Sequence, residues 1–187
     1  MNAPVVSFPL PLLGIAAASG TGKTTLLERL IPSLRQRGLR IALVKHSHHD
    51  FDIDKPGKDS DRLRKAGALQ VVLASQFRKA VIIETPNRDD EPDLVEALAH
   101  LDRGALDLVL VEGYRSEPFP KLELHRPVRE RPLLCLQDPY IIAVAHDAPT
   151  PLDIELPQLD LNDAQAIADW IMAGLENGPL RTPQTLY

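Results

Sequence analysis

The sequence predicts an α/β fold in which a mostly parallel sheet is flanked by helices, with an added β-hairpin. Short apolar runs typical of buried strands alternate with helical segments along the chain. A glycine-rich loop follows the first of these runs, residues 12–17, and leads into a helix. A second strand over residues 40–46 comes next, so the order is strand, loop, helix, strand. This order begins a βαβ unit and favours parallel pairing.

The first helix is predicted from apolar residues at helical spacing between Leu26 and Leu34, with Gly38 as its end. Pro32 lies inside it and should kink it, because proline removes one backbone hydrogen bond. The next elements follow from similar patterns. They are a short helix over 60–66, strands over 69–75 and 80–85 that are close enough for a hairpin, a helix over 93–101, and a strongly apolar strand over 107–113.

Two further strands and one helix complete the prediction. Residues 121–126 alternate in polarity, which suggests a half-exposed strand at a sheet edge, and residues 141–147 should form the last core strand. Asn162 or Asp163 caps a final amphipathic helix. Its apolar face holds Ala166, Ile167, Trp170, Ile171 and Leu175. We therefore expect a flexible segment over 1–10, one domain over 11–175 and a tail over 176–187.

Bulk composition excludes several classes of protein. The 187 residues are 44% hydrophobic and 25% charged, which is ordinary for a globular domain. A net charge of −5 argues against a general nucleic-acid binder, which needs basic charge to displace phosphate counterions. The N-terminus lacks the features of a signal peptide, and no apolar run approaches the ~20 residues of a membrane span. We expect a cytoplasmic protein.

The segment "AAASGTGKTTL" predicts a phosphate-binding loop. Backbone N–H groups of a tight loop at a helix N-terminus converge on an anion, and glycines allow close approach. Lys23 can reach the terminal phosphates and the Thr24 hydroxyl can take a Mg²⁺ position. Ala17 replaces the first glycine of the usual motif, but it ends the strand and removes no donor. The fold is thus P-loop NTPase-like, with phosphates held by Ser19, Gly20, Thr21, Gly22, Lys23, Thr24 and Thr25.

An acidic residue at the end of a neighbouring strand should complete a metal site with Thr24. The run "LVLVEG" supplies Glu112 at that place, followed by Gly113 for a sharp exit. Asp107 precedes the strand and would lie at its far end, so it is better read as a cap or turn residue.

A polar segment after the second strand, "KHSHHDFDIDKPGKDSD", contains three histidines and leaves the ligand-binding edge of the sheet. It is interpretable as a switch-like loop that recognises an anion, as a transition-metal site of His and Asp ligands, or as a solvated loop. A dinuclear hydrolase pattern fails because Phe51 stands where its last histidine is needed. We favour the anion-binding interpretation. The candidate residues in this segment are Lys45, His46, His48, His49, Lys55 and Lys58.

Taken together, these segments resemble the MobB family of molybdopterin-guanine dinucleotide biosynthesis adapter proteins. The resemblance spans roughly residues 12–147. It is carried by "AAASGTGKTTLLERLIP", "VKHSHHDFDIDKPGKDSDRLRKAGA", "VLASQFRKA", "LVLVEGYRSEPFPKLELHR" and "DPYIIAVAHD".

The resemblance implies a GTP-binding protein, usually a homodimer, that hydrolyses GTP weakly if at all. It implies Mg²⁺ held by Thr24 and Glu112, and a role beside MobA, the nucleotidyltransferase that attaches GMP to molybdopterin. The segment from Lys45 to Ser60 would lie near the γ-phosphate or a pterin phosphate. The chain lacks the Asn-Lys pair of the common guanine motif, so Asp147 is the candidate for reading the base.

Two other functions stay open on the residues alone. An ATP-dependent small-molecule kinase or ligase would use the same loop, with Arg62 and Arg64 as potential lid arginines. A metallochaperone GTPase would use the cluster from His46 to His49. The segment "EGYRSEPFPKLELHR" also suggests an anion-binding or docking loop through Arg115, Lys121 and Arg126.

Overall fold

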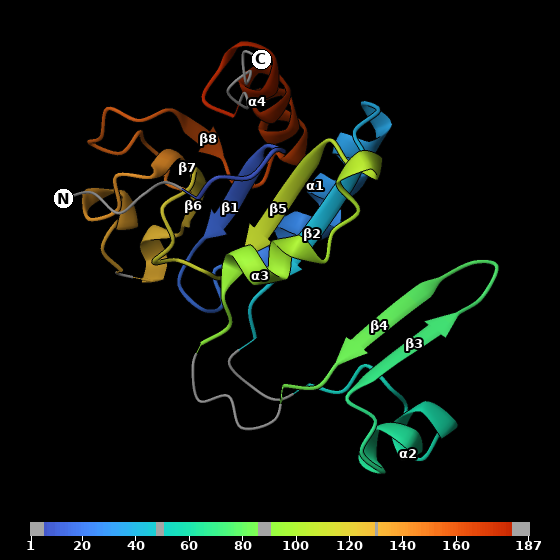
Figure 1. Ribbon diagram of the computed structural model, residues 1–187. Coiled ribbons are helices and arrows are strands. Elements are labelled where there is room, and N and C mark those ends of the chain that lie inside the picture. The colour runs from blue at the N-terminus through green and yellow to red at the C-terminus, as the bar shows by residue number, and fades with distance from the viewer. Residues whose placement is uncertain (1–5, 48–50, 86–90, 130, 181–187) are drawn as a thin grey trace. The chain divides into compact units, whose positions relative to one another are not determined.

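The computed structural model describes residues 6–47, 51–85, 91–129 and 131–180. The chain divides into two compact units (Figure 1). We call Met1–His46 together with Asp93–Tyr187 the sheet unit, and Ser47–Pro92 the hairpin unit.

The sheet unit contains, within the described residues, a six-stranded sheet in the order β2-β5-β1-β6-β7-β8. All its pairings are parallel, which confirms the predicted α/β fold class. The strands are β1 (Leu12–Ala16), β2 (Ile41–Lys45), β5 (Leu108–Glu112), β6 (Lys121–His125), β7 (Ile141–His146) and β8 (Gln158–Asp160). The helices are α1 (Lys23–Gln36), α3 (Leu94–Ala99) and α4 (Ala164–Asn177), with 3₁₀ turns η1 (Arg103–Ala105), η2 (Pro127–Arg129) and η3 (Leu134–Leu136). No helix in the described ranges is both long and apolar enough to cross a membrane.

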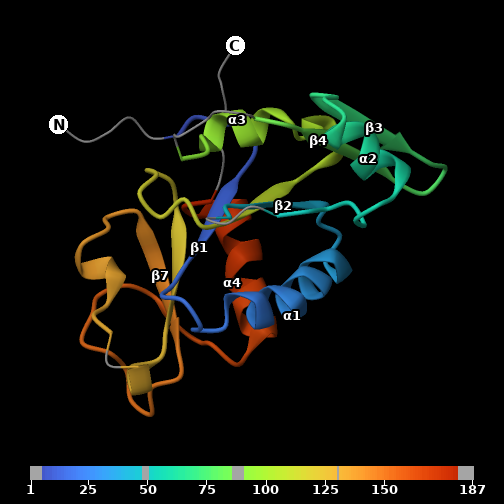
Figure 2. The same cartoon turned by 90° about the horizontal axis from the view of Figure 1, so that it is seen from below.

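Helices cover both faces of this sheet: α1 and α4 lie together on one face and α3 lies on the other (Figure 2). Successive strand residues point to opposite faces, so each strand feeds two cores. In β5, Leu108 and Leu110 pack into the α1–α4 core, whereas Val109 and Val111 pack into the core beneath α3. A strand buried on both faces explains why residues 107–113 are apolar throughout.

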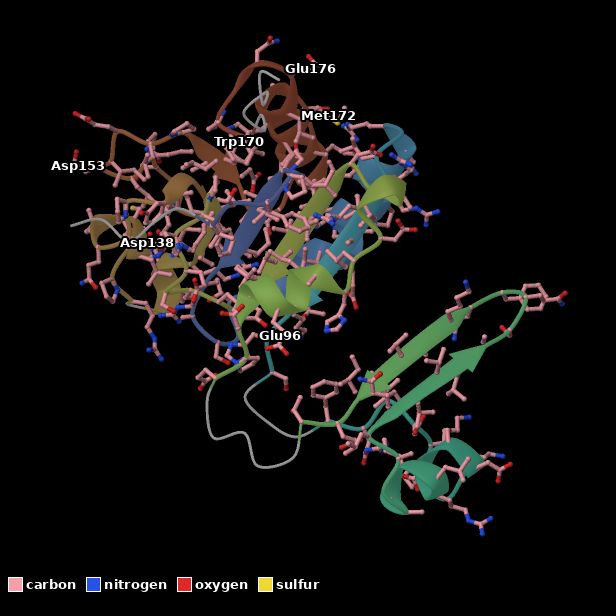
Figure 3. The ribbon with its side chains drawn as sticks, in the orientation of Figure 1. Glu96, Asp138, Asp153, Trp170, Met172 and Glu176 are labelled. Carbon is pink, nitrogen blue, oxygen red and sulfur yellow. The ribbon has the colours of Figure 1, made fainter. Side chains whose placement is uncertain are left out.

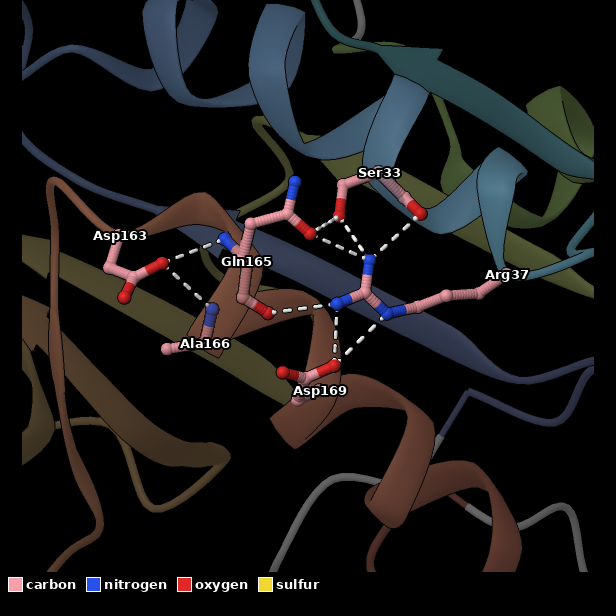
Figure 4. A network of polar contacts seen from close by, with 6 residues as sticks. All are labelled: Ser33, Arg37, Asp163, Gln165, Ala166 and Asp169. Carbon is pink, nitrogen blue, oxygen red and sulfur yellow. Dashed lines mark hydrogen bonds and ion pairs between the residues drawn. The ribbon is translucent and has the colours of Figure 1, made fainter.

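A network of hydrogen bonds connects α1 and α4 where the two helices pack together (Figure 4). The Arg37 guanidinium donates to Asp169 Oδ1 from Nε at 3.0 Å and from Nη2 at 2.5 Å. Its Nη1 donates to Gln165 Oε1 at 2.9 Å and to the Ser33 carbonyl at 3.1 Å. Arg37, at the C-terminal end of α1, thereby contacts two successive turns of α4. Helix α1 continues to this point through Pro32.

The prediction that residues 121–126 form a half-exposed edge strand is wrong. Strand β6 lies between β1 and β7, and all five of its residues are buried. Its charged residues are tolerated there because each has partners: Lys121 Nζ lies 3.0 Å from Asp138 Oδ2, and the Glu123 carboxylate accepts two backbone N–H groups at 2.8 Å. Because these charged residues alternate with apolar ones, a buried strand whose charges are paired has the same sequence pattern as a half-exposed strand.

The C-terminal part differs from the prediction by one strand. Residues 141–147 were expected to supply the last strand, but the three-residue β8 pairs with β7 at the edge. Helix α4 begins as predicted, because the Asp163 side chain accepts the N–H groups of Gln165 and Ala166. It continues two residues past Leu175, and Leu180 is buried against it.

The hairpin unit contains α2 (Asp59–Lys65) and the antiparallel pair β3 (Gln70–Ala74) and β4 (Lys79–Ile83), which confirms the predicted hairpin. Side chains project from both sides of the two strands (Figure 3). Arg64 of α2 holds the unit together through ion pairs with Asp52 and Glu84, each at 2.8 Å. The hydrogen bonds that Arg64 donates to Glu84, and to a lesser extent to Asp52, raise the pKa of Arg64, so its guanidinium stays charged.

Candidate functional site

The predicted phosphate loop joins β1 to α1 at the carboxyl edge of the sheet. Gly20 and Gly22 have φ angles of 75° and 108°, a left-handed region that glycine enters without steric cost. The Thr21 hydroxyl donates to the Ala18 carbonyl at 2.9 Å and closes the turn. Ala17 is buried in the α1–α4 core, so the residue that replaces the usual first glycine contributes to packing and leaves the loop open.

The N-terminus of α1 differs from those of the other two helices in the sheet unit. Helices α3 and α4 begin with Asp93 and Asp163, whose carboxylates accept the first free N–H groups. Helix α1 begins after Gly22, with no side-chain cap and no acidic residue in its first turn. Among the described residues, nothing accepts the backbone N–H groups of Ser19, Gly20, Gly22, Lys23, Thr24 or Thr25. These donors and the positive end of the helix dipole suit an anion.

Lys23 is folded over this loop. Its ammonium lies 3.4 Å from the carbonyl oxygens of both Ala17 and Ala18, long contacts that a stronger anionic acceptor could replace. The side chains of Thr24 and Thr25 are exposed at the start of α1. The loop therefore presents a cation, two hydroxyls and a row of amide donors at one place.

Glu112 is the last residue of β5. It lies opposite Ile15 of β1, the strand that leads into the phosphate loop, and opposite Lys45 of β2. Its side chain is 11% exposed, and its Oε2 lies 3.4 Å from the Lys45 ammonium. The pairing fixes two predicted site residues, Glu112 and Lys45, on adjacent strand ends. Among the described residues, no group of three His, Cys, Asp or Glu side chains is arranged to hold a metal. A metal here would depend on Glu112 together with ligand oxygens, an arrangement that Mg²⁺ commonly adopts.

The turn after Glu112 is packed against His46. Gly113 has a φ of 90°, and a β-carbon added to it would lie 2.6 Å from the His46 β-carbon. The next residue, Tyr114, has a φ of 49° and is buried, with its ring centroid 5.0 Å from that of His46. Burial raises the pKa of the Tyr114 phenol. The structure thus uses His46 to position the turn that carries Glu112.

Asp147 follows β7, as predicted, but its carboxylate is engaged. Arg126, directly after β6, pairs with Asp147 Oδ2 through Nη1 and donates from Nε to the Thr21 carbonyl at 2.9 Å. Arg126 therefore links the phosphate loop to the candidate base-reading residue. The sequence placed Arg126 only in an anion-binding or docking loop. Its position directly after β6, beside β7, which Asp147 follows, was the signal for a site residue.

The histidine segment is only partly described. His48 and His49 lie outside the described residues. In the hairpin unit, Lys58 precedes α2 and is exposed. Asp52 and Asp54, the carboxylates of the alternative metal interpretation, lie 2.8 and 3.5 Å from Arg64. Their proximity to this cation opposes the metal interpretation.

Comparison with known proteins identifies the family. The sequence model described as "Molybdopterin guanine dinucleotide synthesis protein B" matches residues 12–147. The chain belongs to the MobB family. The resemblance inferred from the sequence motifs is thereby confirmed.

Relatives in this family match most of the chain. The molybdopterin-guanine dinucleotide biosynthesis adapter protein of Escherichia coli is 49% identical over 168 residues, which cover 89% of this chain and 94% of that protein. The Haemophilus influenzae protein of the same name is 48% identical over 163 residues, 87% of this chain and 88% of that protein. A crystal structure of molybdopterin-guanine biosynthesis protein B superposes with a TM-score of 0.64 at 26% identity, covering 87% of this chain and 98% of that one.

Proposed function

We propose that this MobB-family protein is a GTP-binding adapter in molybdopterin guanine dinucleotide biosynthesis, with at most weak GTP hydrolysis. The observation that carries the proposal is the uncapped glycine loop at the N-terminus of α1, where six backbone N–H groups lack an acceptor within the described residues. Relatives that match nearly the whole chain bear the adapter name. A cytoplasmic location remains a prediction from the sequence.

The triphosphate would be held by the backbone from Ser19 to Thr25. Lys23 would exchange its two 3.4 Å carbonyl contacts for the terminal phosphates, because a charged acceptor makes a stronger hydrogen bond than a neutral one. Thr24 and Glu112 would hold Mg²⁺, which would neutralise part of the charge of the phosphates. Lys45, already 3.4 Å from Glu112, would turn toward the anion when that carboxylate binds the metal.

Asp147 is the residue that we propose for recognition of the guanine base. Asp147 would accept from the guanine N1–H and amino group only after exchanging its present partner, Arg126. The other candidates, His46, His48, His49 and Lys58, would face the γ-phosphate or a pterin phosphate. His46 already positions the turn at Gly113, so its role would be structural as well.

A homodimer is proposed from the hairpin unit. On one face of β3–β4, Val72 is 64%, Val81 56% and Ile83 37% exposed. On the opposite face, Val71, Ala80 and Ile82 are partly buried. An isolated two-stranded hairpin is at best marginally stable in water, and exposed apolar faces mark interaction surfaces. A second copy of the same hairpin would cover this face by a two-fold symmetric contact.

Calorimetric titration of GTP and ATP with Mg²⁺ tests the nucleotide site. We expect GTP to bind with the higher affinity and Lys23→Ala to lose detectable binding, while Lys79→Ala, an exposed lysine of the hairpin unit, behaves as wild type. Unchanged GTP affinity in Lys23→Ala would contradict the site. Tighter ATP binding would instead favour a kinase or ligase.

The adapter role needs a separate measurement. A MobA-type guanylyltransferase assayed with and without this protein should give more dinucleotide in its presence. Lys23→Ala should remove that stimulation, whereas Lys79→Ala should retain it. Equal yields in all three cases would contradict the adapter assignment.

A further inference from the structure

A cavity of about 210 Å³ lies beside the phosphate loop within the sheet unit. It is lined by residues of the phosphate loop, by the C-terminal end of β6 and by residues that follow β5 and η2. Its principal lining residues are Ala18, Thr21, Arg115, Glu123, Arg126 and Arg131.

Three arginines from three different segments converge on this cavity. Arg115 follows β5, Arg126 follows β6 and Arg131 lies shortly after η2. Among the described residues, Arg115 and Arg131 have no ion pair and no side-chain hydrogen bond. Arg126 is held in place by the Thr21 carbonyl and Asp147, and its Nη2 is left without an acceptor in the same part of the chain.

Two other arginines of the sheet unit each have a carboxylate partner among the described residues. Arg37 and Arg40, which have structural roles, are paired with Asp169 and Asp107. Guanidinium groups gathered around one cavity repel one another unless an anion lies between them. The converging arginines therefore point to a ligand that carries negative charge.

The one carboxylate in the cavity wall does not supply that charge. Glu123 is 1% exposed, and its two oxygens accept the N–H groups of Leu134 and Cys135 at 2.8 Å each. These bonds hold η3, and with it the cavity-lining residue Leu134, against β6. Glu123 makes no ion pair with an arginine of the described chain, so it shapes the site and leaves the guanidinium groups available.

The size of the cavity limits its ligand. Whole nucleotides and cofactors occupy pockets of roughly 300–1,000 Å³, so this one holds a single charged group and little more. Planar guanidinium groups match the paired oxygens of phosphate. We infer that this cavity binds a phosphate group, separate from the triphosphate of the loop, through Arg115, Arg126 and Arg131.

The inference goes beyond the proposed function and does not depend on it. Inorganic phosphate and the phosphate monoester of a small organic molecule share this chemistry. Either would lie against Thr21, a residue of the phosphate loop, and against Arg126, which donates to the Thr21 carbonyl. Occupancy of the cavity should therefore change the affinity of the nucleotide site.

The test is calorimetric titration of inorganic phosphate into the full-length Lys23→Ala variant, in which the loop is disabled. We expect one phosphate to bind per chain. Arg115→Ala or Arg131→Ala, added singly, should weaken binding by about tenfold or more, the effect of one charge-assisted hydrogen bond. Arg35→Ala, an exposed arginine of α1 remote from the cavity, is the matched control and should change nothing.

Three results would overturn the inference: no phosphate binding in Lys23→Ala, equal loss in Arg35→Ala, or displacement of phosphate by GTP from the wild-type protein saturated with Mg²⁺. The last would assign the cavity to the nucleotide. Failure of GTP binding would overturn the proposed function and leave the phosphate result standing. Repeating the titration with phenyl phosphate identifies the source: tighter binding than inorganic phosphate indicates an ester, and weaker binding indicates the free anion.

Discussion

The two units of this protein bury their apolar residues differently. The sheet unit has two cores, one on each face of its sheet, and β1, β5 and β6 are fully buried. In the hairpin unit, the buried residue of α2 is Asp61. Val72 of β3 and Val81 of β4 are more than half exposed. The sheet unit has what an independently folding domain requires, whereas the hairpin unit is held by ion pairs around Arg64 and presents apolar surface outward. We assign the proposed nucleotide binding to the first unit and the proposed assembly to the second.

The sharpest test of the sheet unit is Gly113→Ala. The added β-carbon would meet the His46 β-carbon at 2.6 Å at a backbone φ of 90°, so both overpacking and backbone strain oppose it. We expect a loss of about 2–5 kcal/mol in the free energy of unfolding, measured by urea denaturation. Gly38→Ala is the control, because Gly38 has a φ of 91° but no atom within 4 Å of the added carbon. It should cost about 1 kcal/mol. Equal losses of stability in Gly113→Ala and Gly38→Ala would show that the close contact with His46 contributes nothing to the difference in the free energy of unfolding.

Charge on the open hairpin face should dissociate the proposed dimer. In the Val72→Lys, Val81→Lys double variant, two directly paired positions become cationic. We expect the dimer dissociation constant to rise at least about a hundredfold, since desolvated apolar contacts would be replaced by like charges. Sedimentation equilibrium measures it.

Controls separate assembly from folding in that experiment. Val95→Lys changes an exposed valine of α3 in the sheet unit and should leave assembly unaffected. GTP affinity should be the same in all these variants if the loop works within one sheet unit. A double variant that stays dimeric would place the interface elsewhere.

The features that the sequence predicted correctly are those determined by residues close together in the chain. The strand over 107–113, the loop around Lys23 and the Asp163 cap each depend on neighbours in the chain, and the structure has all three. What it missed depends on distant partners. Strand β6 was misplaced because Lys121 is neutralised by Asp138, seventeen residues away. Arg126 was undervalued because its contacts with Thr21 and Asp147 appear only once three strand ends lie side by side.

A smaller effect is expected at the α1–α4 interface. Arg37→Ala removes donors from Asp169, Gln165 and the Ser33 carbonyl, and should lower the free energy of unfolding by about 1–2 kcal/mol. Arg35→Ala, two residues earlier and exposed, should fall within about 0.5 kcal/mol of wild type. Because the network joins helices of the sheet unit, neither variant should alter assembly. A shift in dimerisation with Arg37→Ala would show that the two units are coupled.

The smallest effect is a pH dependence in which both units take part. Hydrogen bonds from Arg40 lower the pKa of Asp107 to about 2, and hydrogen bonds from Lys65 and the Gly57 N–H lower the pKa of Asp61. A depressed carboxyl pKa stabilises the fold fully above the unfolded value near 4, and this contribution is lost as the pH falls toward 2. Both pairs are partly open to solvent, so each contribution is modest. Carboxyl-carbon NMR titration should show Asp107 with a pKa of about 2 and Asp61 with a pKa below its ordinary value. Urea denaturation should show the free energy of unfolding falling as these groups are protonated. In Asp107→Asn the acid-side fall should be shallower, while the Asp61 resonance keeps its midpoint, since the two carboxylates lie in separate units. A shift of the Asp61 midpoint in that variant would show electrostatic coupling between the sheet unit and the hairpin unit.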